Sequence, residues 1–152
     1  PPPRHPVHLV LCVILVYELA VVGAQLVRLP LALQLEPLRR RVHPTGLARA
    51  VANLLDNARS HGAAPFRLSL RPWEGDGFEI EVADAGAGLD EQLWSQALQP
   101  FRRLDAARGG SGHCGLGLAI AERVARAHRG SLHCRREQQG FAVLLRGHSL
   151  PG

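Results

Sequence analysis

The chain lacks the features that define several common protein classes. It has only three cysteines, which are odd in number and far apart, so the sequence predicts no disulfide framework and indicates a reducing compartment. Aromatic residues make up 5% of the chain and do not alternate with the scattered arginines, which argues against a nucleic-acid surface. No Gly-Lys-Ser or Gly-Lys-Thr sequence occurs, which excludes a Walker-type phosphate loop, and no internal repeat is visible.

The remaining composition fits one globular domain. The 152 residues are 46% hydrophobic and 20% charged, which suffices for one core and leaves no room for two domains. The formal charge of +5 suits an anionic ligand or partner without identifying it. His133 and Cys134 could suggest a zinc site, but adjacent residues on a strand point to opposite faces and cannot easily bind one ion.

The two ends of the chain differ from its middle. Residues 1–6 are rich in proline and predict a linker, residues 7–147 a single domain, and residues 148–152 a tail. Residues 7–27 are almost wholly apolar and predict either a buried helix or a membrane-spanning segment. Glu18 in the middle of this run favours the buried helix, and the absence of a cleavage pattern argues against a secretory signal.

Hydrophobic periodicity predicts alternating strands and helices after residue 30. A helix is expected from Leu47 to Gly62 with Thr45 as its N-cap, and a short one from Asp90 to about residue 98. A third helix, over residues 116–128, should bury Leu116, Ile120, Val124 and Ala127 and end at Gly130 as its C-cap. Strands are expected at residues 31–36, 38–42, 66–71, 78–83, 131–136 and 141–146, and a glycine-rich basic loop at 101–112.

Two asparagines in the helix over residues 47–62 indicate a binding function. Asn53 and Asn57 are one turn apart beside an apolar stripe. Asparagine is about 0.5–0.7 kcal/mol less favourable than alanine in a helix interior, so a pair at this spacing needs a reason. Two carboxamides on one face can present oxygens to a cation or a polyphosphate. The alternative is a pair of solvated polar residues.

Two glycine-rich segments could hold the rest of a nucleotide. Asp84 ends a strand whose Phe78, Ile80 and Val82 share one face, and a carboxylate followed by glycines can accept from the amino edge of a purine. It could equally be a simple turn. Residues 109–117 lead into the third helix, whose unpaired N–H groups favour phosphate. They also match the GxGxxG pattern of dinucleotide folds, with Glu137 as the ribose-binding acid, but no strand precedes them.

Taken in order, these segments resemble the catalytic ATP-binding domain of sensor histidine kinases, the Bergerat or GHKL fold. ANLLDNA resembles the N box, DAGAGL the first glycine box, PFRRLD the F box and GLGLAIAERVARAHRG the second glycine box. The resemblance covers about residues 7–145. It implies an α/β (α+β) two-layer sandwich, in which about three helices pack on one face of a mixed, mainly antiparallel sheet, with an ATP lid at about residues 90–114.

The resemblance also implies ATP and Mg²⁺ as cofactors and assigns roles to residues. Asn57 would bind the metal, Asn53 would lie beside the phosphates as a catalytic residue, and Asp84 would accept from the adenine amine. Arg103 in the lid would neutralise charge during phosphoryl transfer. The alternative is that Arg103 is a solvated arginine of the lid without a catalytic role. The other implied nucleotide contacts are Gly86, Gly88, Leu89, Phe101, Gly112, Gly115, Leu116, Gly117 and Leu118.

The implied activity is that of a protein-histidine kinase in a two-component system. No histidine here lies in the H-[DE]-x-[RKL] context of a phosphoacceptor, so the γ-phosphoryl group would pass to a separate dimerisation domain and indirectly to a response regulator. The domain would be cytoplasmic, and its parent would be anchored in the bacterial inner membrane through other parts.

Two departures from the family pattern keep alternatives open. Ser60 stands where a basic residue is common, and His113 where glycine is usual. One alternative is a GHKL serine kinase or ATPase, for which Asp56 is poorly placed as a general base because it lies about 100° around the helix from Asn57. The other is a nucleotide-binding interaction module without phosphotransfer.

Overall fold

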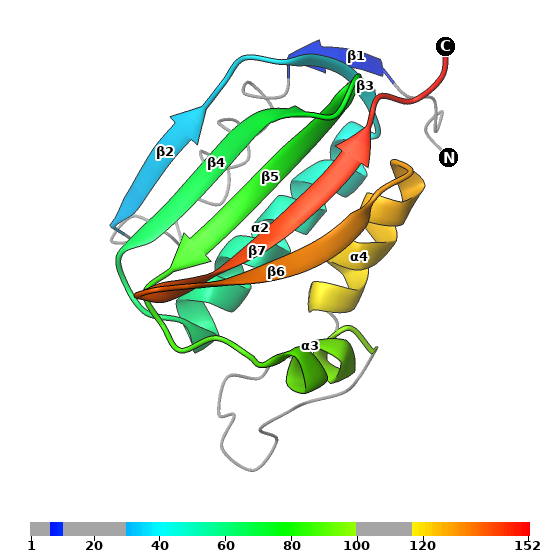
Figure 1. Cartoon of the computed structure of the whole chain (residues 1–152). Helices are drawn as coiled ribbons and strands as arrows, with labels where there is room; N and C mark the ends of the chain where they lie inside the picture. The colour runs from blue at the N-terminus through cyan, green and yellow to red at the C-terminus, as the bar shows by residue number, and fades with distance from the viewer. Residues whose placement is uncertain (1–6, 11–29, 100–116) are drawn as a thin grey trace.

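A five-stranded sheet with strand order β2-β4-β5-β7-β6 forms the centre of the protein (Figure 1). The computed structural model describes residues 7–10, 30–99 and 117–152. Strand β2 runs parallel to β4, and all other neighbours in this sheet are antiparallel. The strands are β2 (Leu31–Leu35), β4 (Phe66–Trp73), β5 (Gly77–Asp84), β6 (Ser131–Glu137) and β7 (Gly140–His148).

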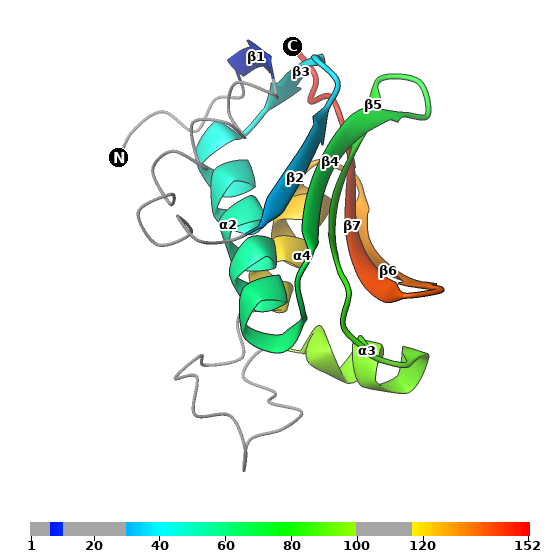
Figure 2. The same cartoon turned by 90° about the vertical axis from the view of Figure 1, so that its left-hand side faces the viewer.

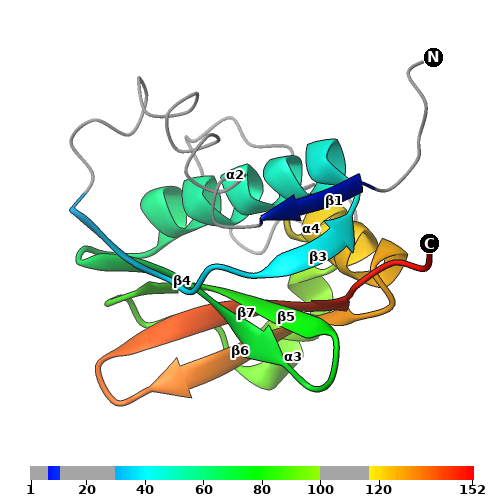
Figure 3. The ribbon, with the colours of Figure 1, turned by 90° about the horizontal axis from the view of Figure 1, so that it is seen from above.

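A second, two-stranded sheet corrects the expectation for the start of the chain. β1 (Val7–Val10) pairs antiparallel with β3 (Arg39–Val42), as Figure 3 shows. The predicted helix over residues 7–27 is therefore wrong for its first four residues, and residues 11–29 lie outside the described part of the chain. A continuous apolar run has no period that separates strand from helix, and the partner strand that decides between them is about 30 residues away in sequence.

The helices α2 (Pro44–His61) and α4 (Gly117–Ala127) both lie on one face of the large sheet (Figure 2). The short helix α3 (Glu91–Ala97) lies near the end of the sheet where β5 finishes, with Trp94 against Phe141. This two-layer sandwich with a mixed, mainly antiparallel sheet confirms the predicted fold class. None of the helices within the described residues has the length and apolar content to cross a bilayer.

Among the described helices, α2 buries the most side chains in the core. Its N-cap is His43, whose side chain makes no capping hydrogen bond, and Pro44 is the first residue of the helix. The prediction of Thr45 as the cap is therefore wrong, because proline with its fixed φ and missing N–H fits the first turn of a helix. The helix buries seven apolar side chains, which are Leu47, Ala48, Ala50, Val51, Leu54, Leu55 and Ala58.

Helix α4 is rotated relative to the stripe that the sequence predicted. It buries Leu118, Ala121 and Ala125, whereas Ala127 is exposed and Leu116 lies outside the described residues. Small residues face inward because α4 packs against both the sheet and α2. At the contact with α2, a Cβ built on Gly46 would lie 3.8 Å from Val124, so the two helices approach closely there.

The end of α4 also differs from the prediction. Arg129, not Gly130, adopts the left-handed conformation with φ of 57°, and the Gly130 N–H donates to Ala125 O at 2.9 Å as in a Schellman motif. Gly130 is needed for a different reason. A Cβ there would lie 2.8 Å from the Cα of Gly147 and even closer to the Arg146 carbonyl on β7.

A buried histidine joins the two helices at this end of the fold. His128 is fully buried, its Nδ1 donates to Val124 O at 2.8 Å, and its Nε2 accepts the His43 N–H at 3.0 Å. This pair of bonds requires the neutral ring with its proton on Nδ1. Burial lowers the pKa of His128, and nearby His43 lowers it further against the opposing bond to Val124 O.

The burial of His128 predicts that folding stability falls as the solution is acidified. Because the folded-state pKa lies below the ordinary 6.5, the unfolded chain takes up the proton first, so stability declines as pH falls from about 6.5. Urea unfolding from about pH 8 to about pH 5 should show this decline. His128→Gln should make this decline smaller, at a cost of about 1–3 kcal/mol at the higher pH. An unchanged pH slope in this variant would contradict the assignment.

Two glycines with positive φ offer a matched pair for testing close packing. Gly75 (φ 64°) faces open space, whereas a Cβ on Gly88 (φ 68°) would lie within 2.6 Å of the Phe141 Cβ and closer to its ring. Gly75→Ala should cost about 1–2 kcal/mol through backbone strain alone. Gly88→Ala should cost about 1–3 kcal/mol more through overpacking, measured by urea unfolding. Equal losses in the two variants would show that Phe141 does not restrict this turn.

Candidate functional site

The carboxyl end of β5 is bonded to the residues that follow α2. Asp84 Oδ1 accepts the Gly86 N–H at 2.6 Å and the Ala63 N–H at 3.4 Å, and the Ala85 N–H donates to Ala63 O at 2.7 Å. Within the described residues, both donors to this carboxylate reach Oδ1. The side chain is half-buried, so Oδ2 can be offered to a ligand in an orientation that the backbone fixes.

Two glycines make this close approach possible. A Cβ on Gly62 would lie 2.5 Å from Asp84 Oδ2, and a Cβ on Gly86 would lie 2.8 Å from Asp84 Oδ1. Any side chain at these positions would push the carboxylate out of its present place. Gly86 was expected from the sequence as a residue beside the base, and the structure places it directly against Asp84.

The rest of the first glycine box contributes to packing. Gly88 faces Phe141, as described above, and Leu89 is partly buried against the core. The segment is held from the neighbouring edge of the sheet by Arg136, whose Nη1 donates to Ala87 O at 2.8 Å. These contacts give the turn after Asp84 a defined shape.

The first turn of α4 lies beside the N-terminal asparagine of the pair on α2. A Cβ on Gly117 would lie 3.8 Å from the Asn53 Cβ, so these two predicted site residues are neighbours. Asn53 Nδ2 is fully enclosed and has no hydrogen-bond partner among the described residues. A buried donor without an acceptor costs about 1–3 kcal/mol, which indicates that the acceptor for this amide lies outside the described residues.

Asn57 lies one turn further along the same helix and is half-buried. Its neighbour Asp56 is directed into an ion pair with Arg59, at 2.5 Å between Oδ1 and Nη2. The helix ends at Gly62, against Asp84. A rise of about 1.5 Å per residue therefore spreads Asn53, Asn57 and the Asp84 contact over about 14 Å of one helix axis.

The structure leaves part of the predicted site untested. Leu118 is buried in the core, so its side chain serves packing and only its backbone could face a ligand. The other predicted contacts lie outside the described residues, as does most of the expected lid, and they are Phe101, Arg103, Gly112, Gly115 and Leu116.

Sequence reasoning missed three positions that shape the site. Gly62 was expected only as the end of a helix, and Ala63 and Phe141 had no expected role at all. The signal for Gly62 was present as a glycine directly after the helix with the two asparagines. Its partner Asp84 is 22 residues away, so only the folded chain shows the contact.

The polar groups of this site suit a nucleoside triphosphate with its metal ion. An enclosed carboxamide donor with no partner among the described residues can bind a phosphate oxygen, and the first N–H groups of a helix such as α4 have no acceptor within the helix itself. The Asn57 side-chain oxygen is a ligand type that Mg²⁺ accepts when phosphates and waters supply the others. The oriented Asp84 carboxylate can accept from an exocyclic amine.

Comparisons with known proteins agree with this geometry. Residues 42–147 match the family described as histidine kinase-, DNA gyrase B- and HSP90-like ATPase. The sensor histidine kinase GtrS of Pseudomonas aeruginosa is 44% identical over 108 residues, which cover 68% of this chain and 21% of that protein. The chain spans from about a fifth to three fifths of the length of the curated relatives that it matches, at 19%, 26% and 60% in three of them.

Solved structures of sensor kinases share the fold. A structure of the mycobacterial sensor histidine kinase MprB has a TM-score of 0.77 at 24% identity and covers 99% of this chain and 100% of its own. Full-length ShkA in complex with AMPPNP has a TM-score of 0.79 at 18% identity, covering 97% of this chain and 32% of its own. The chain therefore belongs to the family of histidine kinase-, DNA gyrase B- and HSP90-like ATPases, as an ATP-binding domain of the sensor histidine kinase type.

Proposed function

We propose that this chain binds ATP with Mg²⁺ and transfers the γ-phosphoryl group to a histidine on a separate dimerisation domain. The observation that carries the proposal is the enclosed Asn53 amide, which has no partner among the described residues and lies beside the first turn of α4. A polyphosphate supplies the missing acceptors at this place. The family of sensor kinases to which the chain is similar supports the choice of histidine as acceptor.

Asp84 gives the site its preference for adenine in this proposal. The Gly86 and Ala63 N–H groups hold Oδ1, so Oδ2 accepts from the amino group of the base. A guanine or hypoxanthine base presents a carbonyl at the same position, which the carboxylate repels. The bond from a neutral amine to a charged acceptor contributes about 1.5–3 kcal/mol.

Asn57 and Asn53 act on the phosphate end of the nucleotide. Asn57 offers its side-chain oxygen to the metal ion, which neutralises charge on the phosphates when bound. Asn53 donates to a phosphate oxygen, and the first N–H groups of α4 surround the same region. The acceptor histidine nitrogen bonds to the γ-phosphorus while the bond from that phosphorus to the bridging oxygen breaks, and ADP leaves. Arg103 and the predicted lid contacts stay predictions.

The serine kinase or ATPase alternative needs an acidic general base beside the metal asparagine. Asp56 is the acidic residue adjacent to Asn57 in sequence, and its carboxylate is paired with Arg59 at 2.5 Å on the outer side of α2. A histidine acceptor needs no such base, because its neutral ring already carries a lone pair. The structure thus supports the histidine kinase reading over this alternative.

The first test is calorimetric titration of Mg-ATP and Mg-ITP into the native chain and into Asp84→Asn. ITP lacks the 6-amino group, so native protein should prefer ATP by about 10- to 100-fold, and Asp84→Asn should lose that preference. Asp76→Asn is the control, since this exposed carboxylate lies at the opposite end of β5. Asn57→Ala should remove the magnesium dependence of ATP binding.

Binding alone does not establish phosphotransfer. The native chain, mixed with Mg-ATP and the dimerisation domain of its parent protein, should phosphorylate a histidine of that domain, which acid-labile incorporation measures. Binding without transfer would favour the nucleotide-binding interaction module. A folded native chain that binds neither nucleotide would contradict the site altogether.

The unpaired amide of Asn53 predicts that its removal stabilises the nucleotide-free protein and weakens the binding of Mg-ATP. Asn53→Leu removes a buried donor without a partner, so the nucleotide-free protein should become more stable by about 1 kcal/mol and lose its stabilisation by Mg-ATP. Asn57→Leu is the matched control for the stability of the nucleotide-free protein, because it has the same gain in helix propensity without an enclosed unpaired donor. Thermal unfolding with and without Mg-ATP measures both effects. A less stable Asn53→Leu would show that the amide has a partner in the free protein.

A further inference from the structure

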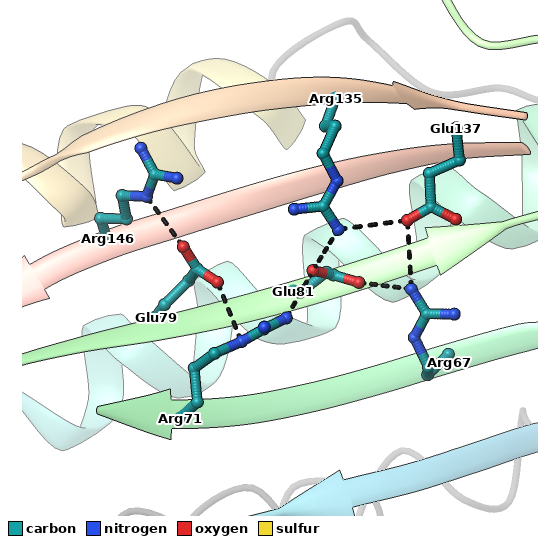
Figure 4. A network of polar contacts seen from close by, with 7 residues as sticks. All are labelled: Arg67, Arg71, Glu79, Glu81, Arg135, Glu137 and Arg146. Carbon is teal, nitrogen blue, oxygen red and sulfur yellow. Dashed lines mark hydrogen bonds and ion pairs between the residues drawn. The ribbon is translucent and has the colours of Figure 1, made fainter. Parts of the chain in front are cut away.

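The face of the large sheet that points away from α2 and α4 carries a layer of charged side chains. Neither of these helices lies on this face (Figures 2 and 3). We call the seven residues in Figure 4 the arginine layer. They come from β4, β5, β6 and β7, and they are Arg67, Arg71, Glu79, Glu81, Arg135, Glu137 and Arg146.

Glu81 is the centre of one half of the layer. It is fully buried and accepts from Arg67 at 2.5 Å and from Arg71 and Arg135 at 2.8 Å each. Burial alone would raise the pKa of this carboxyl, but the hydrogen bonds from Arg67 and Arg135 outweigh it and lower the pKa. Glu81 is therefore ionised at neutral pH beneath three guanidinium groups.

Glu79 is the centre of the other half. Arg71 Nε and Arg146 Nε lie 3.0 and 2.9 Å from its two carboxylate oxygens. The Arg146 guanidinium also stacks over Trp73, with its Cζ 3.9 Å from the ring centroid. The two buried carboxylates are two residues apart on β5, so the two halves of the layer are about 7 Å apart along the strand.

The two glutamates of β5 lie beneath the guanidinium groups of the layer, whereas Glu137 is partly exposed at its edge. The side chains of Glu79 and Glu81 are 4% and 1% exposed, whereas those of Arg71 and Arg135 are each 46% exposed. The charges nearly balance, but the hydrogen-bonding groups do not. Four guanidiniums carry about twenty N–H donors, and three carboxylates offer about twelve acceptor positions. Because these guanidinium groups are partly exposed, the surplus donors are available to water or to acceptors of a partner.

An apolar layer in place of these charges would serve the stability of the fold equally well. Buried ion pairs are often no more stabilising than apolar residues of the same volume, because both charges lose their hydration. Ser69, directly opposite Glu81 on β4, adds a buried hydroxyl with no hydrogen-bond partner among the described residues. All 18 cationic residues of the chain are arginines, the residue type whose planar fork fits a carboxylate with two bonds.

We propose that the arginine layer is a docking surface for an acidic segment of a partner protein. Carboxylates about 7 Å apart, as on alternate residues of an extended segment, match the spacing of its two halves. The surface suits discrete carboxylates better than a polyphosphate backbone, because the half-exposed Glu137 would repel a continuous line of phosphates. The proposal does not depend on nucleotide binding, since the layer and the Asn53 region lie on opposite faces of the sheet.

The probe for this surface is a fluorescein-labelled peptide in which three glutamates alternate with serines. A peptide with glutamine in place of glutamate is its control. The native 152-residue chain should bind the glutamate peptide saturably and at least about tenfold more tightly than the glutamine peptide, measured by fluorescence polarisation. Mg-ATP should not displace the peptide.

A matched pair of double variants locates the binding. Arg135→Gln with Arg146→Gln leaves every carboxylate of the layer with at least one arginine, and it should weaken binding about tenfold or more. Arg123→Gln with Arg126→Gln removes the same charge from exposed positions on α4 and should change binding less than about twofold. If the first pair fails to fold, Arg135→Lys with Arg146→Lys keeps the charge, removes the forks and should also weaken binding.

Three results would overturn the proposal. The first is equal affinity of the native chain for the two peptides. The second is equal weakening by both double variants, which would indicate attraction to net charge alone. The third is that a single-stranded oligonucleotide of equal charge binds more tightly than the glutamate peptide and that the Arg135 and Arg146 double variant abolishes this binding. That result would assign the layer to nucleic acid.

Discussion

The burial of β5 on both of its faces is the constraint on which the rest of the structure depends. Phe78, Ile80 and Val82 pack toward the helices, and Glu79 and Glu81 lie under arginines from three other strands of the sheet. Both layers must form for the strand to keep its place, because a buried carboxylate without its cations costs several kcal/mol. The central strand therefore couples the hydrophobic core to the charged face.

A strand held from two sides can deliver a side chain with precision at its end. Asp84 is the last residue of β5, and its carboxylate accepts hydrogen bonds from the backbone N–H groups of Ala63 and Gly86. Gly62 brings the end of α2 against this carboxylate, so the helix with both asparagines is positioned relative to the same strand. The groups proposed to bind the base and the phosphates are thus positioned by the same strand, and preorganised binding requires such fixed positions.

Periodicity and caps predicted the strands of the large sheet and the three described helices, and the resemblance to histidine kinase catalytic domains implied the fold class. Asp90, for example, was expected to begin α3 and its Oδ1 accepts the Leu93 N–H at 2.8 Å. The sequence-based predictions are wrong where contact with a second helix or strand determines the local structure. α4 turns its alanines inward because α2 crosses close to it at Gly46, and β1 is a strand because β3 pairs with it. Local patterns carry no information about either contact.

The charged face shows the same limit more clearly. Alternation along β5 correctly separates Glu79 and Glu81 from Phe78 and Ile80, and by itself it would assign the glutamates to solvent. They are buried because arginines on β4, β6 and β7 reach across them, from positions up to 67 residues away in sequence. A pattern of single residues cannot distinguish an exposed carboxylate from one beneath three guanidiniums. The distinction matters for function, since the first offers negative charge to a partner and the second offers the donors above it.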